Sequence, residues 1–199
     1  MATSTTRAQQ IGIWIIAVVL TIGTIGSFVV LILANDNSSK SSATKQADYA
    51  KQLADYTAQQ KAAGIANAAN SIALAGYSAA VFDAASVTAL QKDILVTGTG
   101  DEVKATDSIS ASYFGWTSDD TIFDSSTKKN TNTDTPVTFA LSSVIKGWTT
   151  GLTGQRVGST VELTIPSDQA YGASGSGAIP ANAPLKFIVV IHSIAPVAK

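Results

Sequence analysis

In four short segments in the second half of the chain, apolar residues occupy every second position, at 109–113, 137–141, 161–165 and 185–191. A period of two predicts strands that bury one face of a sheet. One stretch between them, SSVIKGWTTGL at 142–152, instead places its apolar residues at helical spacing, with Ser142 or Ser143 as a candidate N-cap. We therefore expect an α+β domain in which an antiparallel sheet wraps around one short helix.

A second constraint comes from the uncharged run at 11–34, IGIWIIAVVLTIGTIGSFVVLILA. About 20 apolar residues suffice to span a bilayer core, and Trp14 stands near one end, where an interfacial aromatic residue is expected. A cleaved signal peptide and a buried core helix are the alternatives. The apolar core of a signal peptide is usually only about 7 to 15 residues long. We expect a transmembrane helix at 11–34 that follows an N-terminal tail at 1–10.

The orientation of this anchor rests on two opposing observations. Lys and Arg are more numerous after the anchor than before it, which favours a cytoplasmic position for the C-terminal side of the anchor. A short tail, one anchor and a compact domain instead resemble an exported protein. We expect a single-pass membrane protein whose compact domain lies outside the cytoplasm.

The stretch at 35–83 is rich in Ala, Ser, Asn and Gln, and Tyr49, Leu53 and Tyr56 recur in it at helical spacing. This composition predicts a linker or spacer that is partly helical and carries no chemistry. The compact domain is then expected at 84–199.

Composition excludes several classes of function. The formal net charge is -1, which gives no electrostatic bias toward nucleic acid. The chain has no cysteine, so disulfides, thiolate catalysis and cysteine-bound metal are excluded. Its single histidine, His192, cannot form a histidine pair for a metal, and its place on the last strand favours a structural or surface role. We expect no metal and no cofactor.

Seven strings of residues occur in an order and spacing that resemble the FKBP family of peptidyl-prolyl cis/trans isomerases. They are VTGTGDEV at 96–103, YFG at 113–115, FDSS at 123–126, VIKGW at 144–148, GLTGQRVGS at 151–159, LTIPSDQAYG at 163–172, and AIP at 178–180 followed by LKF at 185–187. The resemblance covers nearly all of 87–194. It implies a half-barrel in which a twisted antiparallel sheet curls around a short helix.

The resemblance also implies the residues of a substrate pocket. Trp148 would form its floor, Asp124 would be its main polar group, and the Tyr171 hydroxyl and the Ile145 backbone N–H would bond the ligand. The remaining walls would come from Tyr113, Phe123, Val144, Ile179 and Phe187. Lys128 or Lys129 would be the basic partner of the acid. Without the resemblance, Tyr113 and Phe187 would be interpreted as core residues and Asp124 as a turn residue.

The implied activity is isomerisation of X-Pro bonds in polypeptides, which needs no covalent bond to the protein. Proline-containing chains are the expected substrates, and macrolides of the rapamycin type are possible inhibitors. The alternative is a catalytically weak FKBP-like binding module tethered to a membrane. No nucleic acid partner is expected.

Overall fold

The computed structural model describes residues 41–195, with side chains described from residue 46. Residues 64–199 belong to one compact unit, which holds the sheet, and a second unit ends at Ala63. The expected transmembrane helix at 11–34 and the tail before it lie outside the described residues. Within residues 41–195, no helix combines the length and the apolar character needed to cross a bilayer.

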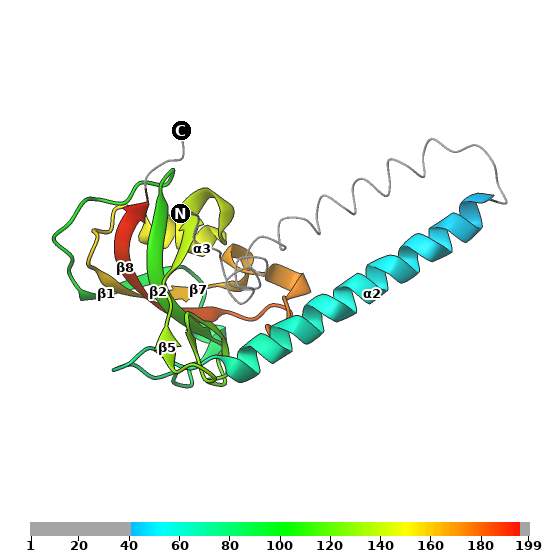
Figure 1. Cartoon of the computed structure of the whole chain (residues 1–199), viewed down its shortest axis with the longest axis horizontal. Helices are drawn as coiled ribbons and strands as arrows, with labels where there is room; N and C mark the ends of the chain where they lie inside the picture. The colour runs from blue at the N-terminus through cyan, green and yellow to red at the C-terminus, as the bar shows by residue number, and fades with distance from the viewer. Residues whose placement is uncertain (1–40, 196–199) are drawn as a thin grey trace, which may run out of the picture. The chain divides into compact units, whose positions relative to one another are not determined.

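The core of the compact unit is a six-stranded antiparallel sheet in the order β1-β7-β8-β2-β3, with β6 also paired to β2 (Figure 1). Its longest pairing joins β2 to β8, from Ser108 opposite Ala195 to Trp116 opposite Lys186. The four alternating segments lie in β2, β6, β7 and β8, so the expected antiparallel sheet is confirmed. The strands are β1 Gln91–Val96, β2 Ser108–Trp116, β3 Ile122–Ser125, β6 Val137–Ala140, β7 Thr160–Ile165 and β8 Leu185–Ala195.

The short helix α3, Lys146–Leu152, packs on one face of this sheet. Two glycines of α3 allow the helix to lie close to strand β7. A Cβ atom on Gly147 would lie 2.4 Å from Ile165 Cγ2, and one on Gly151 would lie 2.6 Å from Leu163 Cδ2. The expected serine cap is wrong, because the N-cap is Ile145, which makes no side-chain capping bond. Ser142 and Ser143 instead lie in the 3-10 turn Leu141–Ser143.

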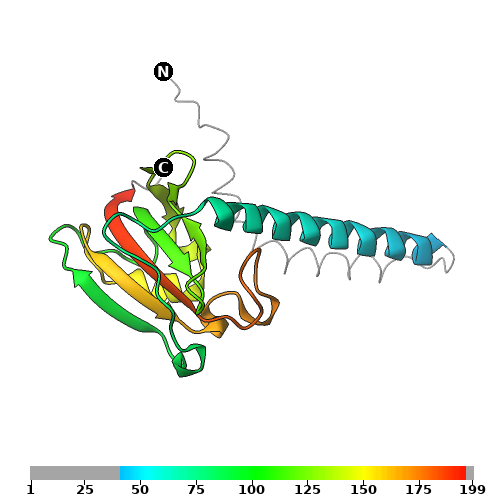
Figure 2. The same ribbon diagram turned by 90° about the horizontal axis from the view of Figure 1, so that it is seen from below.

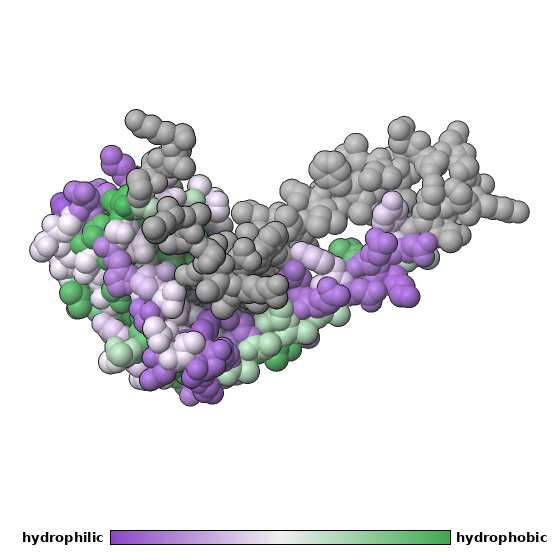
Figure 3. All heavy atoms as spheres, viewed as in Figure 1, coloured by the Kyte–Doolittle hydropathy of each residue, from purple (hydrophilic) through white to green (hydrophobic). Residues whose placement is uncertain are grey.

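The stretch expected to be a spacer differs from that expectation in two ways. The helix α2 runs without interruption over Ser41–Asn70. Tyr49 and Leu53 remain exposed on it, and Figure 3 shows hydrophilic side chains interspersed with weakly hydrophobic ones along its length. The compact unit also begins at Gly64, about 20 residues before the expected start at 84.

The segment at 71–82 belongs to the core of this unit. Leu74 packs with Phe114, Trp116 and Ile188 on the sheet face opposite α3, where Figure 2 shows the segment crossing the strands. The Trp116 indole N–H donates to the Ala80 carbonyl at 2.9 Å. Isolated apolar residues in a stretch of Ala and Ser have no periodicity, which is why the sequence did not predict this packing.

A two-stranded hairpin of β4 (Thr127–Lys128) and β5 (Thr133–Asp134) joins β3 to β6. The end of α2 bonds to it through the backbone. The Lys129 N–H donates to the Asn70 carbonyl at 2.8 Å, and the Ile72 N–H donates to the Thr127 carbonyl at 3.2 Å. The hairpin and the helix end are therefore held as one local structure.

Removal of the 71–82 segment should destabilise the domain. We expect a chain that starts at residue 84 to lose at least about 3 kcal/mol of unfolding free energy relative to one that starts at 64, because Leu74 and Phe82 are lost and Phe114 becomes exposed. Urea denaturation of the two chains measures the difference, and Leu74→Ala in the longer chain should reproduce about 2 to 4 kcal/mol of the loss. Equal midpoints for the two chains would contradict the assignment of 71–82 to the core.

Candidate functional site

Trp148 of α3 is surrounded by aromatic rings from three strands. The ring centroids of Tyr113, Phe139 and Phe187 lie 5.2, 5.0 and 5.2 Å from that of Trp148, with interplanar angles of 86°, 61° and 84°. Phe123 extends the cluster, with its ring 5.5 Å from that of Phe187. Edge-to-face pairs at these distances are favourable beyond the area that they bury. We call these five residues the aromatic cluster.

Three hydrogen-bond donors have no acceptor within residues 41–195. Two lie at the start of α3 and one lies in the 163–172 segment. The Trp148 indole N–H is buried without a partner there. The Ile145 N–H and the Tyr171 hydroxyl likewise make no hydrogen bond within the described part of the chain. Of the three, the Trp148 N–H is the fully buried one, and a buried donor left unpaired costs about 1 to 3 kcal/mol. An arriving molecule with carbonyl oxygens would satisfy such groups.

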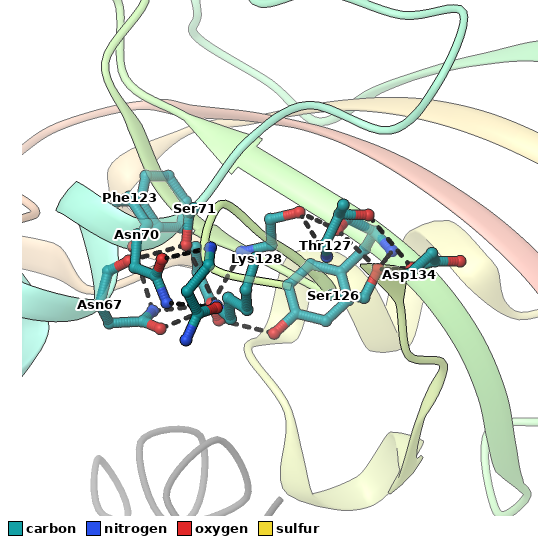
Figure 4. Close-up of polar contacts among 12 residues, drawn as sticks. Asn67, Asn70, Ser71, Phe123, Ser126, Thr127, Lys128 and Asp134 are labelled. Atoms are coloured by element: carbon teal, nitrogen blue, oxygen red, sulfur yellow. Dashed lines mark hydrogen bonds and ion pairs between the residues drawn. The ribbon is translucent and has the colours of Figure 1, made fainter. Parts of the chain in front are cut away.

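Asp124 of β3 is the polar group next to the aromatic cluster. Its Oδ2 accepts a hydrogen bond of 2.6 Å from the Tyr113 hydroxyl. Its Oδ1 accepts from Asn67 Nδ2 at 2.8 Å, from Lys128 Nζ at 3.1 Å and from the Ser125 N–H at 2.8 Å. Figure 4 shows Asn67 of α2 and Lys128 of β4 close to Phe123 of β3, the residue before Asp124. Of the two lysines considered as the basic partner, the structure pairs Lys128 with the acid.

Both tyrosines of the site are held as neutral phenols. Burial, followed by the charge of Asp124 and the hydrogen bond to it, raises the pKa of Tyr113 well above its ordinary value. Burial, followed by the charge of Asp124, also raises the pKa of Tyr171. Each hydroxyl therefore stays a donor at neutral pH, and only that of Tyr113 is already bonded to Asp124.

The structure gathers most of the expected pocket residues. Tyr113, Phe123, Trp148 and Phe187 share the aromatic cluster, and Asp124 adjoins it through Tyr113. The other four occupy loops and turns: half-buried Val144 and Ile145 precede α3, half-buried Tyr171 lies between two 3-10 turns, and buried Ile179 pairs with Ser176.

Two residues of the site were not predicted from the sequence. One is Phe139, whose ring contacts both Trp148 and Tyr113. Its place on an alternating strand fits either a core or a site residue, so periodicity could not separate the two roles. Asn67 lies in the stretch expected to carry no chemistry, yet it bonds Asp124. No local pattern marks an asparagine within an Ala-rich helix as part of a site.

A second polar cluster lies apart from the aromatic cluster. His192 Nε2 lies 2.7 Å from Ser112 Oγ, and that hydroxyl donates to Asp134. Leu74, Tyr77 and these three residues line a hollow of about 230 Å³. A nucleophilic serine needs the imidazole between hydroxyl and carboxylate, whereas here the hydroxyl stands in the middle. The cluster is therefore not arranged for attack by Ser112.

Within residues 41–195 no three His, Asp or Glu side chains gather so that they could hold a metal ion. What the site offers is an aromatic surface and a few donors, which suits an apolar group carried by carbonyl-bearing backbone.

The raised tyrosine pKa values predict alkaline instability. Between the ordinary value of 10.0 and the raised native value, the unfolded chain releases the Tyr171 proton while the folded chain keeps it. Unfolding free energy should therefore fall as pH rises above about 10. In Tyr171→Phe that fall should be smaller by up to about 1.4 kcal/mol per pH unit. Urea denaturation from pH 8 to 11.5 measures both slopes, and identical slopes would contradict the burial of this phenol.

Comparisons with known proteins identify a family for this domain. The family model described as FKBP-type peptidyl-prolyl cis-trans isomerase matches residues 100–192. The FKBP-type isomerase FkpA of Aeromonas hydrophila is 44% identical over 105 residues, which are 53% of this chain and 38% of that protein. This chain thus spans well under half of the length of that relative.

Two further similarities concern a solved structure and a second relative. A crystal structure of a peptidyl-prolyl cis-trans isomerase from Pseudomonas syringae pv. tomato str. DC3000 is 35% identical, covers 54% of this chain and 76% of that one, and superposes with a TM-score of 0.48. FK506-binding protein 2 of Debaryomyces hansenii is 44% identical over 94 residues, which are 46% of this chain and 67% of that protein. At that identity and coverage, the chain belongs to the family of FKBP-type peptidyl-prolyl cis-trans isomerases.

Proposed function

We propose that this chain catalyses cis–trans isomerisation of X-Pro bonds in polypeptides. The barrier of about 18 to 20 kcal/mol arises from the resonance that keeps the amide planar. An enzyme lowers it by binding the twisted amide more tightly than either planar form. A twisted amide has lost its dipolar resonance form, so it loses less hydration than a planar amide when it enters an apolar site.

The observation that carries this proposal is the arrangement of Tyr113, Phe139 and Phe187 edge-on around Trp148, beside Asp124. A proline ring needs an apolar aromatic surface, and this cluster supplies one. In the proposed complex, the ring lies against Trp148 and the Ile145 N–H and Tyr171 hydroxyl donate to substrate carbonyls. Phe123, Val144, Ile179 and Phe187 form the walls. Macrolides of the rapamycin type would compete for the same surface.

The proposal predicts that Asp124→Ala and Trp148→Leu each lower kcat/KM by at least about tenfold. Asp124→Ala removes the carboxylate beside the twisted amide, and Trp148→Leu removes the aromatic floor. The measurement is cis-to-trans conversion of an X-Pro peptide by the full chain, against a spontaneous reaction that takes tens to hundreds of seconds at 25 °C.

Two matched variants control for loss of fold. Trp116→Leu removes an equally buried tryptophan from the opposite sheet face, and Asp119→Ala removes a carboxylate whose bonds go to Thr117 and Thr121 in a turn. Both should keep the parent rate under conditions where they remain folded. A folded parent no faster than the spontaneous reaction would leave the alternative, a binding module that holds proline-containing chains without catalysis.

We also propose that the 11–34 segment anchors the chain in a membrane and that the catalytic domain lies outside the cytoplasm. The support is the length of the uncharged run, which matches a bilayer core. The full chain should float with lipid vesicles in a density gradient, while a chain that starts at residue 41 should stay at the bottom.

The orientation has a separate test. Protease added outside intact cells should digest the domain of the full chain if that domain lies outside the cytoplasm. In the flotation test, flotation of both chains, or of neither, would contradict the proposal that 11–34 is a membrane anchor.

A further inference from the structure

The last turns of α2 lie against two separate parts of the candidate site. Gly64 approaches the 175–179 turn so closely that a Cβ atom on it would stand 2.4 Å from Gly177 Cα. One turn further along the helix, Asn67 bonds Asp124. The 175–179 turn also carries Ile179, an expected wall of the pocket. The helix end is thus fixed against both the polar and the apolar side of the site.

Asn67 stands between an acid and a base and satisfies both. Its Nδ2 donates to Asp124 Oδ1 at 2.8 Å, and its Oδ1 accepts from Lys128 Nζ at 2.8 Å. The orientation of the amide is unambiguous, because a carboxylate only accepts and an ammonium only donates. Among the side chains, only an amide offers a donor and an acceptor side by side in this way. Asn67 therefore holds Asp124 and Lys128 in a fixed arrangement.

Ser71 connects the backbone of Asn67 to Lys128 through two further bonds. Ser71 Oγ donates to the Asn67 carbonyl at 2.9 Å and accepts from Lys128 Nζ at 3.1 Å. Figure 4 shows Asn67, Ser71 and Lys128 converging on one point beside β3. Asparagine is a weaker helix former than alanine or leucine. If Asn67 served only the helix, its replacement by either residue would be neutral or stabilising.

We propose that Asn67 is a positioning residue of the isomerase site: it orients the Asp124 carboxylate toward the substrate, so the site is complete only when the end of α2 is in place. The proposal rests on the isomerase function proposed above. The Asp124 Oδ2 already bonds Tyr113, and Asn67 and Lys128 fix Oδ1 from the other side. Together these bonds leave the carboxylate one orientation.

The test compares substitutions at two asparagines of the same helix end. Asn67→Leu keeps the size and removes both bonds to the acid and the base. Asn67→Asp keeps the acceptor for Lys128 but turns a donor into a second negative charge facing Asp124. Asn67→Gln retains both functions on a longer side chain. Asn70→Leu is the matched control, because the Asn70 side chain exchanges its bonds with Asn130 only and does not touch Asp124.

We expect the full chain carrying Asn67→Leu or Asn67→Asp to lose about fivefold to twentyfold in kcat, with KM changed by less than about twofold. Asn67→Gln should recover part of that loss, and Asn70→Leu should keep the parent rate. Combined with Asp124→Ala, Asn67→Leu should lower the rate by less than about twofold further, because a residue that acts through Asp124 has nothing left to position.

The outcomes separate the two proposals. Asn67→Leu at the parent rate, in a parent that Asp124→Ala slows, would overturn the positioning role alone. An equal loss of rate in Asn70→Leu, or a full additional loss in the double variant, would also overturn it, since both indicate a general effect of the helix end on the fold. A parent that does not isomerise X-Pro bonds would overturn the isomerase function and this inference with it.

Discussion

The close contact between α3 and β7 determines where the aromatic side chains of the site meet. Because Gly147 and Gly151 lack side chains, the helix lies against Ile165 and Leu163. At that separation Trp148 reaches rings from β2, β6 and β8 at once. A larger residue at either glycine would move the helix away from the sheet and open the aromatic cluster.

The two faces of the sheet pack against different parts of the chain. One face holds α3 and the aromatic cluster, and the other is covered by the 71–82 segment through Leu74, Phe114 and Trp116. Alternation along β2 places Tyr113 on the first face and Phe114 on the second. The strand therefore contributes one aromatic ring to the site and the next to the core under the covering segment. Asp124, bonded from three directions by Tyr113, Lys128 and Asn67, adds a polar group with a fixed orientation.

Much of the fold could be predicted from sequence because strands with one buried face leave a period-two signal. The strand β1 left no such signal, since Ile94, Leu95 and Val96 are consecutive and all remain about half exposed. The place of Trp148 on the short helix was predicted from the family-like sequence motifs, including VIKGW at 144–148. Contacts between distant segments could not be predicted. Neither Leu74 against Phe114 nor Asn67 against Asp124 is encoded in any local pattern, because each depends on how the chain returns to the sheet.

Isomerisation of X-Pro bonds on the aromatic cluster is tested most directly by two-dimensional exchange NMR of an X-Pro peptide with a substoichiometric amount of the full chain. The chemical shifts of the protein are followed in the presence of excess peptide. We expect cis–trans exchange cross-peaks within a second, against a spontaneous exchange of tens to hundreds of seconds. We also expect the largest shifts on Trp148, Tyr171 and Phe187. Exchange at the spontaneous rate, or shifts centred on the hollow beside His192 instead, would contradict isomerisation on this cluster.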